Sequence, residues 1–69
     1  MTEIKTEVRQ DYALVYVQEG AEKLWQVDLH KNPFTNIWRV SDVGYMTDEL
    51  RGVVAEAIVL QDVLNSKRS

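Results

Sequence analysis

The spacing of apolar residues changes period once along this chain, near Thr47, and that change sets the class of fold. Before Thr47, apolar and polar residues alternate in several short segments, which is typical of β-strands. After it, apolar residues recur every three or four positions, which is typical of an amphipathic helix. A sheet and a helix each have an apolar side that must be buried against another element. The sequence therefore predicts an α+β fold, a three-stranded or four-stranded antiparallel meander with one C-terminal α-helix packed across one face.

Three segments show the alternation most clearly, and we expect each to form a strand. They are residues 12–18, 23–30 and 37–43. Aromatic and β-branched residues, which strands favour, are frequent in them. Gly20 lies between the first two segments and can take a positive φ without steric cost, so residues 19–22 predict a hairpin turn. The Asn32-Pro33 dipeptide predicts the next turn.

Residues 1–10 leave two expectations open. Charged residues alternate there with less polar ones, as in a strand with one face in solvent. The spacing of Ile4, Val8 and Tyr12 also fits a helix. We therefore expect this segment to be either an edge strand or a flexible arm.

The helix is expected over residues 48–65, with a tail at residues 66–69. Thr47 is a favourable N-cap, and the negative charges of Asp48 and Glu49 suit the positive end of the helix dipole. Most of the large apolar residues of this segment fall in one stripe, which should face the sheet. They are Leu50, Val53, Val54, Ala57, Leu60 and Leu64. Gln61 interrupts the edge of this core stripe.

A second stripe lies on the other side of the expected helix. It consists of Gly52, Ala55, Val59 and Val63, at spacings of three and four residues. Gly52 costs about 1 kcal/mol against alanine in a helix interior, so a packing reason is worth considering. One hypothesis is a partner-binding or dimer-forming face on which small residues admit another backbone. The other is a pair of ordinary solvent-exposed valines.

The aromatic residues divide between the core and the surface. Because one helix covers only one face of a sheet, some rings must lie on the uncovered face or at its margin. We expect Trp25 and Trp38 in the core, because each lies on an alternating apolar face. Tyr12 and Tyr16 share one face of the strand predicted over residues 12–18. For each of them, a buried ring and an exposed interaction residue remain equal alternatives. The predicted interaction residues are Gly52, Ala55, Val59, Val63, Tyr12 and Tyr16.

Composition narrows the class of protein further. The chain has 69 residues, which allow a single small domain, and its 45% hydrophobic content and net charge of −3 exclude a disordered tail. It has no cysteine, which excludes a disulfide scaffold. No apolar run approaches the roughly 20 residues of a membrane span, and no signal-peptide pattern is present. We therefore expect a soluble, cytoplasmic protein.

Few residues offer catalytic or ligand-binding chemistry. The single histidine, His30, shares a predicted strand face with Asp28, but a stable metal site needs three or four ligands. The three serines have no base beside them in the sequence, and no glycine-rich phosphate loop is present. We expect no enzymatic activity, no cofactor, no metal and no small-molecule substrate.

The hypothesis that fits these patterns best is a small, non-enzymatic protein–protein interaction module. Its partner would be a second copy, forming a homodimer, or another protein. The overall character of the sequence suggests an accessory protein of the kind that phages and mobile elements encode.

Two alternatives involve nucleic acid. The first is a single-strand binder using Tyr12, Tyr16 and Arg39, which the negative net charge disfavours. The second is an inhibitor of a nucleic-acid enzyme whose acidic helix imitates phosphates. Its acidic residues would be Glu49, Glu56 and Asp62.

Overall fold

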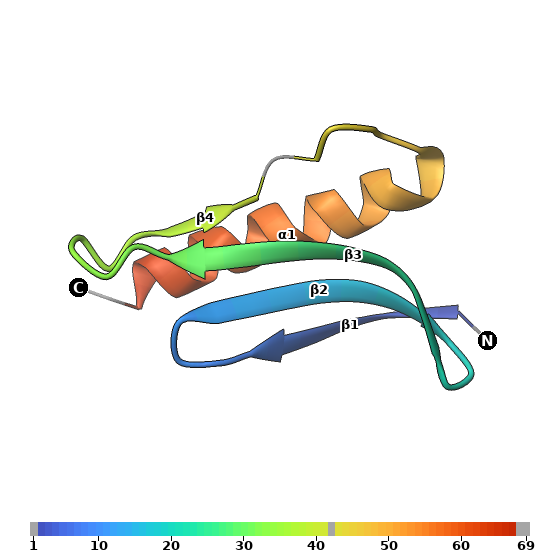
Figure 1. Ribbon diagram of the computed structural model, residues 1–69, viewed down its shortest axis with the longest axis horizontal. Helices are drawn as coiled ribbons and strands as arrows, with labels where there is room; N and C mark the ends of the chain where they lie inside the picture. The colour runs from blue at the N-terminus through green and yellow to red at the C-terminus, as the bar shows by residue number, and fades with distance from the viewer. Residues whose placement is uncertain (1, 42, 68–69) are drawn as a thin grey trace.

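The computed structural model describes residues 2–41 and 43–67, which form four strands followed by one helix (Figure 1). The elements are β1 (Thr2–Val8), β2 (Tyr12–Glu19), β3 (Glu22–Lys31), β4 (Trp38–Val40) and α1 (Asp48–Ser66). The sheet has the order β1-β2-β3-β4, and every neighbouring pair is antiparallel. This confirms the predicted α+β meander with four strands. The described part of residues 1–10 is an edge strand along most of its length, not an arm.

The β2–β3 hairpin turns at Gly20, as its sequence predicts. Glu19 pairs with Glu22, which leaves a two-residue loop, and Gly20 has φ +62°. Two-residue hairpin loops need a positive φ at a central position, and glycine adopts it without strain. Further along the hairpin the register shifts between Val17 and Gln18, so Leu24 is an extra residue on β3 with no partner on β2. Such a bulge increases the local twist of the strand.

The fourth strand is shorter than predicted: Trp38–Val40 replaces residues 37–43. Ile37 belongs to the preceding turn, because its N–H donates to Thr35 Oγ1 at 3.3 Å and its carbonyl accepts from Asn32 N at 2.9 Å. Asn32 organises that turn, since its Oδ1 also accepts from the backbone of Phe34 at 2.8 Å. Side-chain hydrogen bonds of this kind replace ladder bonds at the start of a strand. Of the predicted strand's last residues, Asp42 lies outside the described part of the chain.

The core lies between α1 and one face of the sheet. Its buried residues on the strands are Ala13, Val15, Val17, Val27, Leu29 and Trp38. The helix contributes buried Leu50, Val53 and Ala57, while Val54, Leu60 and Leu64 pack against the cluster with part of their surface in solvent. This confirms the predicted core stripe and the core position of Trp38. The same prediction for Trp25 is wrong, because its side chain is 38% exposed.

The helix begins where its sequence predicts and lies off-centre on the sheet. Thr47 Oγ1 accepts from the N–H of Leu50 at 3.1 Å, which is an N-cap hydrogen bond. The last helical residue is Ser66, one residue beyond the prediction. The helix packs against β2, β3 and β4, and β1 lies at the side of the sheet farther from it (Figure 1). Trp25 lies toward the hairpin end of β3 and lines an open groove that the start of α1 does not fill.

In the described residues, no helix has both the length and the apolar character needed to cross a membrane.

Candidate interaction surfaces

The two edges of the sheet differ, and the β4 edge is closed by side chains of α1. Val40 donates its backbone N–H to Gln61 Oε1 at 2.8 Å, and Trp38 donates its own to Asn65 Oδ1 at 2.8 Å. Asn65 Nδ2 donates in return to the carbonyl of Trp38 at 3.2 Å. Gln61 and Asn65 lie one helical turn apart, so their amides meet alternate residues of β4 as a neighbouring strand would. In the sequence, the only signal of this Gln61–Asn65 pair is the polar interruption that Gln61 makes at the edge of the core stripe.

The β1 edge is open, and the hydrogen bonding beside it shows which backbone groups it presents. Arg9 N–H donates to Tyr12 carbonyl at 2.7 Å, so this pair is hydrogen-bonded. Hydrogen-bonded and non-hydrogen-bonded pairs alternate along an antiparallel ladder. Lys5 and Glu7 therefore direct their backbone groups toward β2, whereas the even-numbered residues of β1 direct theirs outward. Since β1 ends the sheet on this side, no strand in the described part of the chain pairs with those outward N–H and C=O groups.

Beside this edge, the helix side of the sheet has an apolar surface that α1 leaves uncovered. Ile4 and Val8 are each 47% exposed, although they lie on the same side of the sheet as the core. Near Ile4, an open groove of about 410 Å³ runs toward the start of the helix. It is lined by Ile4, Val17, Glu19, Leu24, Trp25 and Glu49. The bulge at Leu24 places two consecutive large apolar side chains in this groove.

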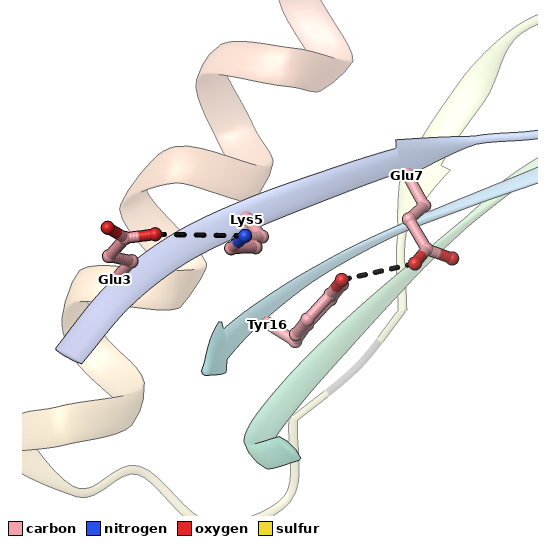
Figure 2. Close-up of polar contacts among 4 residues, drawn as sticks. All are labelled: Glu3, Lys5, Glu7 and Tyr16. Atoms are coloured by element: carbon pink, nitrogen blue, oxygen red, sulfur yellow. Dashed lines mark hydrogen bonds and ion pairs between the residues drawn. The ribbon is translucent and has the colours of Figure 1, made fainter. Parts of the chain in front are cut away.

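The opposite side of β1 is charged, and its charges alternate in sign. Glu3 and Lys5 form an ion pair of 3.7 Å along the strand, and Glu7 and Arg9 form another of 3.6 Å (Figure 2 shows the first). All four side chains are substantially exposed to solvent. Exposed pairs of this kind contribute little to stability, so the charges remain available to another chain.

Tyr16 is a buried residue of this charged face. Its hydroxyl donates to Glu7 Oε1 at 3.1 Å, as Figure 2 shows, and Lys23 Nζ lies 4.7 Å from the centre of its ring. Only 6% of the residue is exposed. Burial, and then the hydrogen bond to Glu7 and the negative charge of that carboxylate, raise the pKa of Tyr16 above its ordinary value of 10.0. Tyr16 therefore presents almost no surface to a partner, whereas Tyr12 is 44% exposed.

The predicted second stripe of α1 lies in solvent. Val59 is 56% exposed and Val63 43% exposed, and Gly52 and Ala55 are exposed as well. A Cβ atom added at Gly52 would meet no atom within 4 Å, so no packing within the described chain accounts for this glycine. Ile58, which the sequence reasoning did not include, lies beside the stripe and is 48% exposed. The assignment of this stripe as an interface remains a prediction.

The residues named in the nucleic-acid hypotheses are only partly brought together. Tyr12, His30 and Arg39 form one row across β2, β3 and β4, and all three are exposed. Tyr16 lies four residues further along β2 and is buried. On α1, Glu49 and Glu56 lie on one side, while Asp62 is turned from them by roughly 120–140°. The three carboxylates therefore do not form a single row.

The chemistry around His30 is sparse. The nearby Asp28 accepts a hydrogen bond from Gln26 Nε2 at 2.8 Å. In the described residues, no three histidine or carboxylate side chains are grouped in a way that would hold a metal ion. Phe34, at the tip of the β3–β4 turn, is 93% exposed and was not singled out as an interaction residue from the sequence.

Comparison with known proteins found no matching family model, no similar curated protein and no similar solved structure, so function must be argued from the geometry of these surfaces.

Proposed function

We propose that this chain is a small, non-enzymatic protein–protein interaction module that associates with itself. The observation that supports the proposal best is the combination of an open β1 edge with uncovered apolar side chains beside it. Backbone groups on an open strand edge form hydrogen bonds with another chain readily. Apolar side chains next to that edge are removed from water when the strands pair, which makes the free energy of pairing more favourable.

The distribution of exposed apolar side chains also supports this proposal. Twelve large hydrophobic residues in the described chain are at least 38% exposed. Single exposed apolar residues are normal on any protein, but contiguous ones indicate interaction sites. Here Ile4, Leu24 and Trp25 line one groove, and Val59 and Val63 follow each other on the outer side of α1. Two surfaces are therefore candidates for the contact, one on the sheet and one on the helix.

The alternative of nucleic-acid binding has less support. The Tyr12–His30–Arg39 row offers two exposed rings but one permanent cation, within a chain of net charge −3. Affinity for nucleic acid depends strongly on the number of cationic contacts to phosphate. The Tyr12–His30–Arg39 row supplies few such cationic contacts.

Sedimentation of the full chain over a wide range of protein concentrations tests the proposal. We expect a reversible shift from monomer to dimer as concentration rises. A chain that stays monomeric at every concentration would contradict self-association. The double variant V59K/V63K then separates the two surfaces, because its loss of dimer would assign the helix stripe and its retention would assign the sheet. Circular dichroism of the variant checks that it remains folded.

A further inference from the structure

We infer that the self-contact is the β1 edge, which pairs antiparallel with β1 of a second copy about a two-fold axis at Thr6. The inference rests on the proposed self-association and specifies its surface and register. The two four-stranded sheets then become one continuous sheet of eight strands. Both helices lie on the same face of that sheet, because residues directly opposite in an antiparallel pair point to the same side.

The hydrogen-bond pattern limits the registers that such a pair can adopt. The outward backbone groups of β1 belong to the even-numbered residues, among them Ile4, Thr6 and Val8. A ladder forms only when outward-facing residues lie opposite each other. A two-fold axis on a residue satisfies this condition, whereas an axis between two residues would set an outward-facing residue opposite an inward-facing one. The axis must therefore pass through one residue pair.

Charge selects among the registers that remain. With the axis at Thr6, Lys5 of one copy faces Glu7 of the other, and Glu3 faces Arg9. By symmetry, this register forms four pairs of opposite charge and none of like charge. Directly opposed charges of opposite sign stabilise a strand pair, and like charges destabilise it. The β1 sequence is thus complementary to itself when its direction is reversed.

Neighbouring registers are poorer. An axis at Lys5 would place two Lys5 side chains together and would set Glu3 against Glu7. An axis at Glu7 would place two Glu7 carboxylates together and would set Lys5 against Arg9. An axis at Ile4 keeps opposite charges together but forms two such pairs in place of four. An axis at Val8 also forms two along the strand, because the residue it sets opposite Lys5 is Asp11 of the hairpin turn. The Thr6 register is therefore the one that β1 favours.

The helix side of the sheet agrees with the same register. Ile4 and Val8, which are half-exposed in the single chain, lie opposite each other across the new contact. Ile4 already pairs with Val17 and Val8 with Ala13 on the neighbouring strand. Apolar side chains then form an uninterrupted row from one copy into the other. In order, this row is Trp25, Val17 and Ile4, followed by Val8, Ala13 and Leu29 of the second copy.

The first test removes the outward N–H donor of Thr6 from each copy, and with it both hydrogen bonds at the centre of the contact. Thr6→Pro deletes an N–H that points away from β2, and proline is tolerated at such positions of edge strands. We expect T6P to be folded by circular dichroism and monomeric in sedimentation at concentrations where the wild type is dimeric. The double variant V59K/V63K should remain dimeric, because its substitutions lie on the far side of α1.

The second test uses charge and does not depend on proline being tolerated. K5E and E7K each set like charges opposite each other in the Thr6 register, and two such pairs should raise the dissociation constant at least about tenfold. An equimolar mixture of K5E and E7K restores an opposite charge at every pair, so we expect a heterodimer of wild-type affinity. Matched controls are R51E and E56K, which make the same charge changes on exposed positions of α1 and should leave the dimer intact.

The outcomes separate this inference from the function on which it rests. Loss of dimer in T6P and in each single charge variant, with recovery in the mixture, supports β1 pairing at Thr6. A dimer that survives these substitutions, or that is lost in V59K/V63K alone, overturns the β1 contact but leaves self-association standing. A wild-type chain that remains monomeric overturns both. Loss in K5E and E7K without recovery in the mixture overturns the Thr6 register.

Discussion

At the scale of single residues, two tyrosines on the same face of β2 have different roles because of their neighbours. Tyr12 begins the strand and is 44% exposed, whereas Tyr16 lies mid-strand beneath Lys23 and is hydrogen-bonded to Glu7. The sequence places both on one face but does not show which one its neighbours cover. That depends on the cross-strand register, which brings Glu7 and Lys23 to the ring from β1 and β3.

The raised pKa of Tyr16 predicts a pH dependence of stability. Because the folded state favours the neutral phenol, its contribution is complete below pH 10.0, the ordinary pKa, and is lost as pH rises through the raised pKa. The variant Y12F/Y45F retains Tyr16 alone of the three tyrosines, so tyrosinate absorbance reports it directly. We expect the midpoint of this pH titration to be higher for the folded variant than for the same variant unfolded in urea. Adding E7Q should lower the midpoint, and an unchanged midpoint would contradict the role of Glu7.

Gly52 provides a second test at this scale. Alanine at this exposed helix position meets no atom within 4 Å, so Gly52→Ala should stabilise the fold by about 1 kcal/mol. Urea unfolding measures the change in the free energy of unfolding. If Gly52 instead admits the backbone of a partner, G52A will also weaken association in sedimentation. A G52A variant that is less stable but associates normally would contradict the open space around Gly52.

At the scale of elements, the Gln61–Asn65 pair substitutes for a strand beside β4. Edge strands present unpaired backbone groups, and proteins commonly cover such edges with a helix. Here the cover makes specific hydrogen bonds, with two amide side chains on one side of α1 meeting Trp38 and Val40. The pair thereby fixes the position of the helix along the sheet as well as closing its edge.

Removing one of these amides should destabilise the fold. Asn65→Ala leaves the N–H and carbonyl of Trp38 without their partner in a half-buried position, and we expect a loss of about 1–2 kcal/mol in the free energy of unfolding. Asp62→Ala is the matched control, because it makes a similar truncation at an exposed position of the same helix. Equal urea midpoints for N65A and D62A would contradict a role for the Asn65 hydrogen bonds.

The elements themselves were predictable to different degrees. The helix and its core stripe follow from local periodicity and from the Thr47 cap, and both are confirmed. The start of β4 did not follow, because Asn32 and Asn65 take part in hydrogen bonds that depend on the folded turn and on the docked helix. Of the candidate surfaces, the helix stripe is visible as a period in the sequence. An edge strand was one of the two expectations for residues 1–10. The exposure of its apolar side chains Ile4 and Val8 is not visible in the sequence, since it depends on where α1 lies across the sheet.

At the scale of the whole molecule, stability and association should be coupled. A partner that binds only the folded state stabilises it by an amount that grows with the logarithm of its concentration once that concentration exceeds the dissociation constant. We therefore expect the urea midpoint of the wild-type chain to rise with protein concentration, while that of T6P stays constant. Added salt should reduce the rise, because the paired charges of β1 are exposed and are screened. A midpoint independent of concentration for both chains would contradict this coupling.

The unequal edges of the sheet also limit how far assembly can proceed. A chain with two open edges can add copies at both sides without end, which is the geometry of a fibril. In this chain, side chains of α1 hydrogen-bond to the outward N–H groups of Trp38 and Val40, so a helix would cover both outer margins of a pair joined through β1. Under the proposed β1 pairing, strand addition would therefore end at two copies. If the chain pairs through β1 as proposed, the amides of Gln61 and Asn65, on the opposite edge of the sheet, would prevent growth into a filament.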